Sequence, residues 1–415
     1  MSKSYVTAPD AEAENDRRIR VIFIGGARYT TPLDTTSAKK FRALQGLVEP
    51  FVIGFAQDFR PRRFTENAHF YLLPQLPLAI LRYAEIVAAG LCLTGWLISR
   101  HDVQVVVAQS PYEGFAAAWA KKIANRLGYK VTLVIESHGD FVESIFLQRH
   151  ILFPGLYSLL MRWVARFTLR HADVLRVISH STKQQLEHWV SGKPIYQFPT
   201  WTDIDMFLQA GGEETEGAGQ HILYAGVLIP RKGVHYLIDA FANIAQHCPH
   251  VSLILVGHAA NKTYVATLQE QVGRLRLAGR VQFVDQVPQQ ELAAWMRNAC
   301  VFVLPSTSEG LGRVVIEAMA TGLPVIGSRV GGIPGMIDNG TTGFLVSPGD
   351  VPALAERLQW VLAHPAEAHA MGRRARAFAE HFFSTAAYVH GYRRIFAAAQ
   401  AFLTGQGDKR ADTPL

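Results

Sequence analysis

The sequence predicts an α/β protein made of two doubly wound domains, each with a parallel sheet covered by helices. Short runs of consecutive apolar residues alternate with helical patterns along the chain, and the runs form two series separated by a break at 195–202. Strands that are buried on both faces have this continuous apolar character, which is typical of parallel sheets between helices. The length of 415 residues is sufficient for two or three domains of ordinary size.

The N-terminal series predicts the first sheet. Its apolar runs lie at 21–24, 51–55, 103–108, 131–135 and 174–178, and a helical pattern covers 113–127. The most hydrophobic window, 71–99, is interrupted by Arg82 and Glu85. Its uncharged remainder, 86–99, is shorter than the roughly 20 residues of a membrane span. We therefore expect a buried or interfacial helix in this window.

The C-terminal series predicts the second sheet. Its apolar runs lie at 222–225, 251–256, 281–284, 301–304, 324–327 and 344–346. Helical patterns lie at 234–247, 352–362 and 384–403, and the polar stretch 211–219 predicts a surface loop.

The break divides the chain into domains. We expect an N-terminal domain over 1–197, with 1–18 flexible, and a C-terminal domain over 198–383. A helix at 384–404 is expected to cross back to the N-terminal domain, and 405–415 to form a flexible tail. Ligands of such folds bind outside the carboxyl ends of the strands, which predicts a site in a cleft between the two domains.

Charge and cysteine content limit the partners and the compartment. Lys and Arg total 41 against 34 Asp and Glu, a net charge of +7. This surplus suits an anionic substrate or membrane surface, or simply a mildly basic soluble protein, but it is too diffuse to indicate nucleic acid. The three cysteines are far apart and form no disulfide framework or zinc motif, and the N-terminus lacks the apolar core of a signal peptide. We expect a cytoplasmic protein.

The strongest motif joins a predicted strand to a predicted helix. After 301–304 comes a Ser- and Gly-rich loop, PSTSEGLG, with Glu309 near its end and Glu317 eight residues later. Backbone N–H groups at such a helix start form an anion site that suits phosphate. The two carboxylates could accept hydrogen bonds from hydroxyl groups at different points of one ligand, such as a sugar. The alternative is one carboxylate at the helix start and one solvated further along.

A second motif, YAGVLIPRKG at 224–233, places Arg231 and Lys232 beside another helix start. Adjacent cations near the positive end of a helix favour a bound anion, for which a nucleotide diphosphate is suitable. Two solvated loop charges are the alternative.

Two N-terminal motifs follow strands. His138 stands at the carboxyl end of the strand 131–135, where it would face the cleft, although a lone His is usually structural. Neighbouring Glu136 and Asp140 could bind an acceptor hydroxyl or act as caps. The pair Gly25–Gly26 follows the first predicted strand but is not GxGxxG, which disfavours a nicotinamide site.

The segment 155–171 has the pattern of a basic amphipathic helix. Arg162, Arg166 and Arg170 recur every four residues beside Leu159, Trp163 and Phe167. Such a helix could lie on an anionic bilayer, as a peripheral contact on the inner face of the membrane. The alternative is a core-facing helix with a solvated Arg stripe.

Taken together, these motifs resemble those of the retaining glycosyltransferases of family 4, whose GT-B fold has two Rossmann-like domains facing across a cleft. Glu309 and Glu317 match the E-x7-E motif of that family. The resemblance covers almost all of the C-terminal domain. It is weaker in the N-terminal domain, where it rests on Gly25–Gly26, on His138 and the two residues after it, and on Ala172–Asp173.

The resemblance implies a role for each matching residue. Glu309 would contact the donor sugar, and Glu317 the nucleotide ribose. His138 would contact the transferred sugar. The remaining expected contacts to the nucleotide sugar are Gly25, Gly26, Gly226, Arg231, Lys232, Leu311 and Gly312.

The sequence departs from the family at two positions. Val227 stands where members usually have Arg, and Gly335 where Glu often follows GGIP.

We therefore expect transfer of a sugar from a nucleotide diphosphate sugar to a hydroxyl of a glycan, lipid or small molecule. The resemblance implies retention by front-face displacement, with no cofactor. The sequence has no GxxxxGK[ST], HExxH or Cys/His cluster, and its pair Asp203–Asp205 lies in a linker, so we expect no metal. Lys232 and Arg231 would stabilise the charge on the leaving diphosphate. A nucleotide-sugar epimerase and a non-catalytic subunit of a glycan-assembly complex are the alternatives.

Overall fold

The computed structural model describes residues 18–138, 154–210 and 221–405. The predicted loop 211–219, residues Gly139 and Asp140, and nearly all of both predicted flexible ends lie outside these ranges. Contacts group the described residues into two compact units. The first holds 18–135, 167–174 and 396–405, and the second holds 136–138, 154–166, 175–210 and 221–395.

The first sheet has eight strands in the order β3-β4-β2-β1-β5-β6-β7-β8. The five predicted strands are confirmed as β1 (Arg20–Tyr29), β2 (Glu49–Ala56), β5 (Val105–Ala108), β6 (Thr132–Ser137) and β7 (Val174–Val177). The pairs β1–β2, β1–β5 and β5–β6 are parallel. The central strands are almost completely buried, in keeping with their continuous apolar sequences.

Three strands of this sheet are absent from the sequence prediction: β3 (Arg62–Thr65), β4 (His69–Leu73) and β8 (Ile195–Gln197). β3 is a mostly exposed, antiparallel edge strand, and β8 has only three residues, at the place where the strand pattern was expected to stop. Short edge strands bury too little surface to show a clear apolar pattern.

The window 71–99 is divided between a strand and a helix. Its first residues belong to β4, and α2 (Ala79–His101) begins after two prolines. By length and composition, Ile80–His101 is long and apolar enough to cross a membrane, with 22% of the window buried. Of the two expectations, a buried or an interfacial helix, the buried one is wrong for most of the helix, because its uncharged outer face is exposed at Ala84, Ala88, Cys92 and Trp96. The interfacial one stays a prediction.

The glycine pair Gly25–Gly26 also differs from the prediction, because it lies inside β1 and not after it. The register with β2 shifts between Ile24 and Arg28, so the pair occupies a bulge. A Cβ at Gly25 would come 2.1 Å from Oε1 of Gln109, which shows that this glycine makes room for a side chain of the same unit.

The second sheet has six strands in the order β11-β10-β9-β12-β13-β14, and each neighbouring pair is parallel. All six were predicted, and they are β9 (His221–Ala225), β10 (Ser252–Val256), β11 (Val281–Val284), β12 (Val301–Leu304), β13 (Val325–Ser328) and β14 (Phe344–Val346). Five of the helices around it are α8 (Val234–Ala245), α9 (Lys262–Arg274), α10 (Gln289–Arg297), α11 (Arg313–Ala320) and α12 (Val351–Ala363). Tyr224, Phe241 and Phe302 are fully buried in the core between sheet and helices.

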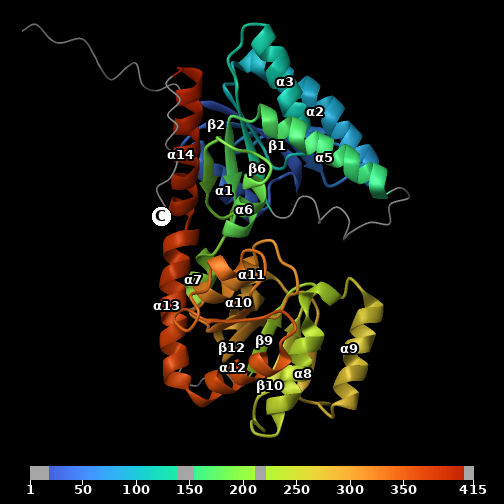
Figure 1. The fold of residues 1–415 in the computed structure, drawn as a ribbon, viewed down its shortest axis with the longest axis vertical. Helices are drawn as coiled ribbons and strands as arrows, with labels where there is room; N and C mark the ends of the chain where they lie inside the picture. Colours follow the sequence, from blue (N-terminus) through green and yellow to red (C-terminus); the bar gives the residue numbers. More distant parts are fainter. Residues whose placement is uncertain (1–17, 139–153, 211–220, 406–415) are drawn as a thin grey trace, which may run out of the picture. The chain divides into compact units, whose positions relative to one another are not determined.

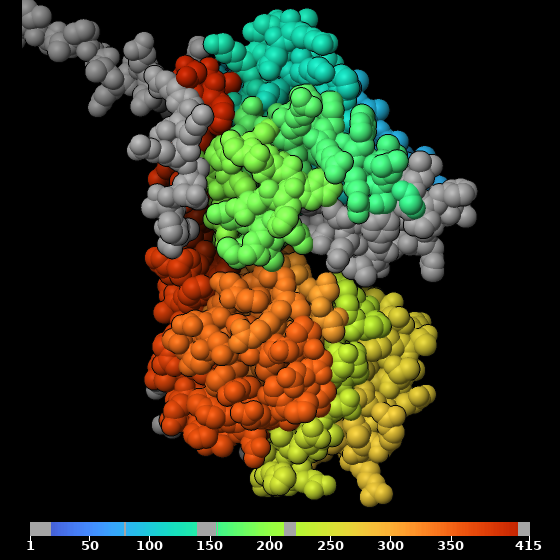
Figure 2. Space-filling model, viewed as in Figure 1, coloured from blue at the N-terminus to red at the C-terminus, as the bar shows by residue number. Residues whose placement is uncertain are grey.

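The other helices are shown in Figure 1. They are α1 (Thr35–Gln45), α3 (Gly114–Arg126), α5 (Pro154–His171), α6 (His180–Glu187), α7 (Asp205–Ala210), α13 (Pro365–Phe383) and α14 (Thr385–Leu403), with two short 3₁₀ turns, η1 (Pro230–Lys232) and η2 (Ile333–Gly335). Residues of α5 and α6, in green, form part of the outer surface in the space-filling view of Figure 2.

Candidate functional site

The loop between β12 and α11 is the centre of the site. Two glycines with left-handed backbone shape it: Gly312, with φ 83°, is the N-cap of α11, and Gly331 has φ 55°. A Cβ at Gly331 would come 1.7 Å from the carbonyl oxygen of Glu309, and Gly332 N donates to Gly310 O at 2.8 Å. Two backbone segments thus pack directly against each other beside the first turn of α11, the part of a helix whose N–H groups have no partner in the preceding turn.

An ion pair joins this loop to the turn after β9. The ammonium of Lys232, on η1, contacts the carboxylate of Glu309, and Ser306 Oγ donates to the same oxygen at 3.3 Å. The two charged side chains are 13% and 12% exposed, so water screens the pair only weakly. Because β9 and β12 are neighbours in the sheet, residues 77 apart in sequence meet at one edge.

Arg231 points to the same loop but is more exposed. Its Nη1 donates to Ser308 O at 3.4 Å, and its own carbonyl accepts from Thr307 N at 2.8 Å. The turn that carries the two cations is therefore tied to the loop that carries Glu309.

Glu317 lies on α11 and is buried, which excludes the alternative of a solvated carboxylate at that position. Burial raises the pKa of its carboxyl group to about 7, and nearby Arg313 opposes this rise only in part. The two acids of the motif thus differ: Glu309 is paired with a cation, whereas Glu317 lies in a medium that disfavours its charge.

His138 lies directly after β6 and is part of a buried network that the sequence analysis did not find. Its Nε2 is 2.8 Å from Oε2 of Glu136, whose Oε1 accepts from Arg176 Nη1 at 2.9 Å and from Tyr392 OH at 2.5 Å. A Cβ at Gly310 would be 3.5 Å from the carbonyl oxygen of His138, so His138 adjoins the Glu309 loop. The feature of the sequence that could have revealed this network is the charged Arg176 within an otherwise apolar predicted strand.

Burial opposes the ionisation of Glu136, yet Arg176, His138 and Tyr392 together hold its pKa well below the ordinary value. Burial likewise works against the charge of Arg176, but Glu136 keeps the pKa of that guanidinium raised. This is a buried ion pair with its hydrogen bonds largely satisfied.

The two positions that depart from the family pattern lie in turns. Gly226 has φ 155°, and the carbonyl of the next residue, Val227, accepts from Tyr224 OH at 3.1 Å. The Val227 side chain is 41% exposed. Gly335 ends η2, where a Cβ would meet open space.

Gly25 and Gly26 belong to the other compact unit. A Cβ at Gly26 would lie 3.1 Å from Oε1 of Glu113. Burial raises the pKa of the Glu113 carboxyl group.

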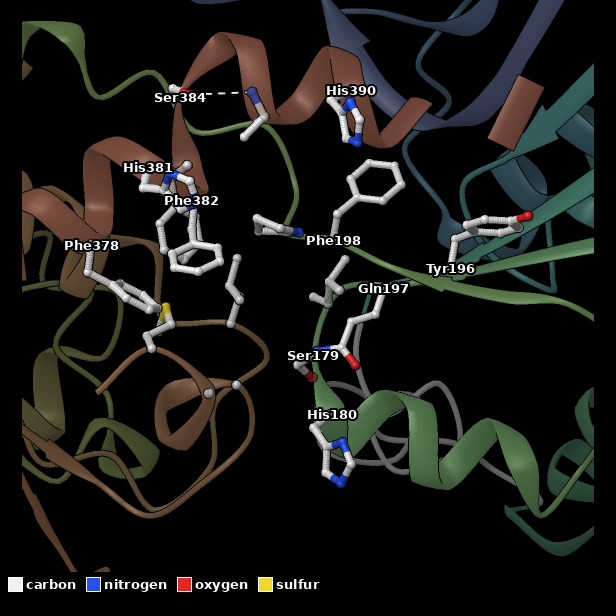
Figure 3. Close-up of a pocket in the computed structure, with 18 of the residues that line it drawn as sticks. Ser179, His180, Tyr196, Gln197, Phe198, Phe378, His381, Phe382, Ser384 and His390 are labelled. Atoms are coloured by element: carbon white, nitrogen blue, oxygen red, sulfur yellow. Dashed lines mark hydrogen bonds between the residues drawn. The ribbon is translucent and has the colours of Figure 1, made fainter. Parts of the chain in front are cut away.

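A pocket of about 1450 Å³ lies within the second unit (Figure 3). Phe378, His381 and Phe382 of α13 line it in one part, and Tyr196, Gln197 and Phe198 in another. Leu311 and Gly332 of the two packed loops also line it, so both loops form part of the pocket wall.

The predicted amphipathic helix is confirmed as α5. Arg162, Arg166 and Arg170 are exposed, and the exposed apolar side chains are Leu159, Leu160 and Trp163, at 67%, 53% and 54%. Phe167, predicted as part of the outer apolar surface, is instead half-buried and stacks on Trp119.

Within 18–138, 154–210 and 221–405, no group of three or more His, Cys, Asp or Glu side chains has the geometry of a metal site. Of the pair Asp203–Asp205, the second residue begins α7, and its N–H donates to Oδ1 of the first at 3.4 Å.

Solved structures with the same architecture show the fold of the chain. Sucrose-phosphate synthase from Thermosynechococcus elongatus matches with a TM-score of 0.70 at 23% identity, over 92% of this chain and 100% of that chain. HepE of Anabaena in complex with UDP matches with a TM-score of 0.69 at 20% identity, over 91% of this chain and 100% of that chain. The chain has the GT-B fold.

The sequence comparisons then give the family. The model "Glycosyltransferase Family 4" matches residues 41–206, and the model "Glycosyl transferases group 1" matches 213–378. A GDP-mannose-dependent alpha-(1-6)-phosphatidylinositol monomannoside mannosyltransferase of Mycolicibacterium smegmatis is 31% identical over 66% of this chain and 72% of that protein. A D-inositol 3-phosphate glycosyltransferase of Streptomyces avermitilis is 38% identical over 39% of this chain and 36% of that protein. The chain belongs to the family 4 glycosyltransferases.

The structure thus brings together most of the site predicted from the sequence. His138, Lys232, Arg231, Glu309, Leu311 and Gly312 lie on or beside the two loops at the ends of β9 and β12 and the end of β6. Glu317 follows on α11. The roles expected for these residues stay predictions.

Proposed function

We propose that this glycosyltransferase moves a hexosyl group from a nucleoside diphosphate hexose to a hydroxyl of a lipid-linked acceptor. The anomeric configuration is retained, and neither a divalent metal nor a further cofactor is needed. The observation that carries the proposal is the pairing of Lys232 with Glu309 beside the start of α11.

That pairing would supply opposite charges to the two parts of the donor that separate on cleavage. When the sugar leaves, negative charge grows on the diphosphate, and Lys232, Arg231 and the amides at Leu311 and Gly312 would stabilise it. Fixed positive groups of this kind can serve in place of a metal ion, because they are already oriented before the reaction.

The carboxylates would hold the hydroxyl groups of the donor. Glu309 accepts from the reacting sugar, and Glu317, further along α11, accepts from the ribose. His138, which adjoins the Glu309 loop at Gly310, would contact the transferred sugar. The acceptor would attack the face that the diphosphate leaves, which retains the configuration, and a phosphate oxygen would take the acceptor proton.

Three observations support a lipid-linked acceptor and a nucleotide donor. The mycolicibacterial relative is named for GDP-mannose and a phosphatidylinositol mannoside, and HepE was solved with UDP-glucose. The exposed face of α5 combines aliphatic and aromatic side chains with three cations, which suits peripheral contact with an anionic bilayer.

The test is transfer by the purified chain. It is incubated with a panel of GDP- and UDP-hexoses, with and without lipid acceptors, and donor consumption is followed by mass spectrometry. We expect an acceptor-dependent product whose anomeric configuration, determined by NMR, equals that of the donor, and activity that survives excess chelator. Donor isomerisation without acceptor would indicate an epimerase. Absence of transfer with every donor, while nucleotide still binds, would favour a non-catalytic subunit.

A further inference from the structure

The hydrogen bonds around Glu136 determine which nitrogen of His138 carries the proton. An ionised carboxylate can only accept hydrogen bonds. Oε1 already accepts from Arg176 and Tyr392, and Oε2 lies 2.8 Å from His138 Nε2. Nε2 must therefore be the donor, and in the neutral ring Nδ1 is then left as an acceptor.

Glu136 is itself held from several elements. Glu136 and His138 are two residues apart at the end of β6, so their side chains leave the chain on the same side. Arg176 enters from β7 and Tyr392 from α14. The guanidinium of Arg176 also donates to Pro199 O at 2.7 Å and lies 4.1 Å from the ring centroid of Phe198.

Burial makes this arrangement rigid. The side chains of Glu136 and Arg176 are 3% and 1% exposed, whereas that of His138 is 35% exposed. The network thus has a buried end that fixes the carboxylate and an open end at the imidazole ring. Among the residues that the structure describes, none hydrogen-bonds to His138 Nδ1.

We propose that Glu136, fixed by Arg176 and Tyr392, is a positioning residue that holds His138 as the Nε2–H tautomer and so offers Nδ1 as a hydrogen-bond acceptor to a substrate hydroxyl. The effect on turnover rests on the proposed function, because it requires that His138 contact the transferred sugar. The tautomer itself does not depend on that function.

The test uses Glu136→Gln in the full chain. Arg176 and Tyr392 require an acceptor, so the amide oxygen should face them and the amide NH₂ should face His138. The ring should then switch to the Nδ1–H tautomer. NMR shifts of the histidine ring nitrogens report the tautomer at a pH where the ring is neutral, and the signal is assigned by its loss in His138→Gln. We expect turnover to fall by about tenfold or more, with nucleotide affinity changed less than about twofold.

Two variants separate positioning from simple loss of stability. Tyr392→Phe removes one donor to Oε1 but keeps the ion pair, and should keep the Nε2–H tautomer. Thr132→Val removes a buried hydrogen bond to Ala399 O of the same helix α14 without touching the network, and should change neither tautomer nor turnover. If Glu136→Gln does not fold because Arg176 is left unpaired, Glu136→Gln with Arg176→Met removes the buried charge as well.

The proposal would be overturned by an Nδ1–H tautomer in the unaltered protein, by an Nε2–H tautomer that persists in the Gln variants, or by an unchanged turnover after the switch. If the tautomer switches as expected but no donor is ever turned over, the proposed function fails and the positioning of the ring by Glu136 stands.

Discussion

Lys232 and Glu309 form an ion pair across two loops that are 77 residues apart in sequence, and both side chains are largely shielded from water. The cation proposed for the diphosphate therefore contacts the carboxylate proposed for the sugar. Because the pair is shielded, removing one partner leaves the other poorly compensated. Variants at either position are best compared with a double variant, so that the coupling between the two is measured directly.

Glu309→Gln should lower turnover more than nucleotide binding, because the partner proposed for Glu309 is the reacting sugar. Turnover is measured with saturating donor and acceptor, and nucleotide affinity by calorimetry. Glu317→Gln is the matched control, with the same chemical change eight residues along. If both variants bind nucleotide and turn over like the parent, the assignment of the two carboxylates is wrong.

Glu317→Gln should stabilise the ligand-free protein in alkaline solution. The pKa of Glu317 is raised by burial from 4.5 to about 7, so between these values the folded chain holds a proton that the unfolded chain releases. The contribution of this carboxyl group to the free energy of unfolding is therefore greatest below pH 4.5. It is lost as the pH rises through 7, where the group ionises in the folded chain. Above pH 7, the free energy of unfolding of Glu317→Gln should exceed that of the parent by up to about 3 kcal/mol, because the Gln side chain stays neutral. Chemical denaturation on both sides of the range measures this; an equal stability difference at both pH values would contradict it.

The same variant should bind nucleotide more weakly, by about 1–3 kcal/mol, because it loses a charged hydrogen bond to the ribose. In the parent, the affinity for nucleotide should rise with pH as Glu317 ionises. Glu317→Gln should lack this part of the pH dependence. Titrations of GDP and UDP about one pH unit below and above the pKa provide the comparison, since ionisation of the phosphate is common to both proteins.

Gly233→Ala should destabilise the site more than Gly279→Ala. Both glycines are left-handed, with φ 68° and 78°, so both variants lose about 1–2 kcal/mol from the backbone. A Cβ at Gly233 would also come 2.0 Å from Pro305 O, whereas at Gly279 it meets open space. We expect Gly233→Ala to lose at least about 1 kcal/mol more in denaturant unfolding and to weaken nucleotide binding. Equal losses would show that this close approach is unimportant.

The strands that could be predicted are those buried on both faces. β1, β2, β9 and β12 have continuous apolar sequences because helices cover both sides of the sheet. β4 could not be separated from α2, because a short apolar run does not distinguish a buried strand from a helix. The prolines before α2 were the available signal, and they show where the window divides.

The site was predictable where its residues share a local motif and not where distant elements supply them. Glu309 and Lys232 follow strands that are neighbours in the sheet, so parallel topology brings their loops together. The contact of Tyr392 with Glu136 joins residues 256 apart through α14, whose packing no local pattern specifies. Arg176 could have been suspected, since a buried strand tolerates an arginine only with a partner.

Replacing Arg162, Arg166 and Arg170 with Gln should reduce co-sedimentation with anionic vesicles, most clearly at low salt. The matched control removes three exposed arginines elsewhere, Arg274, Arg297 and Arg373, with the same change in net charge. Lys replacements in α5 should restore binding in large part, because the attraction to the surface is mainly electrostatic. If the parent and the α5 variant bind vesicles equally, the three arginines are solvent-exposed charges that take no part in membrane contact.

This chain has Val227 in place of the family's usual Arg. The Val227 side chain is 41% exposed and supplies no charge, which leaves Lys232 as the more buried cation of the turn. Arg231, next to it, donates to Ser308 O and so points toward the Glu309 loop. We expect it to supply part of the missing charge, since its planar group can bind two phosphate oxygens. Lys232→Ala should then lower turnover by about two to three powers of ten, because its charge interaction strengthens in the transition state.

Arg231→Ala should cost less, about 1–3 kcal/mol divided between donor binding and turnover. If Arg231 compensates for Val227, then Val227→Arg should restore part of the activity of Arg231→Ala, while changing the parent much less. The kinetics are measured with saturating acceptor over a range of donor concentrations. Donor KM and kcat of Arg231→Ala that match the parent would show that Arg231 is only a surface charge held by Ser308.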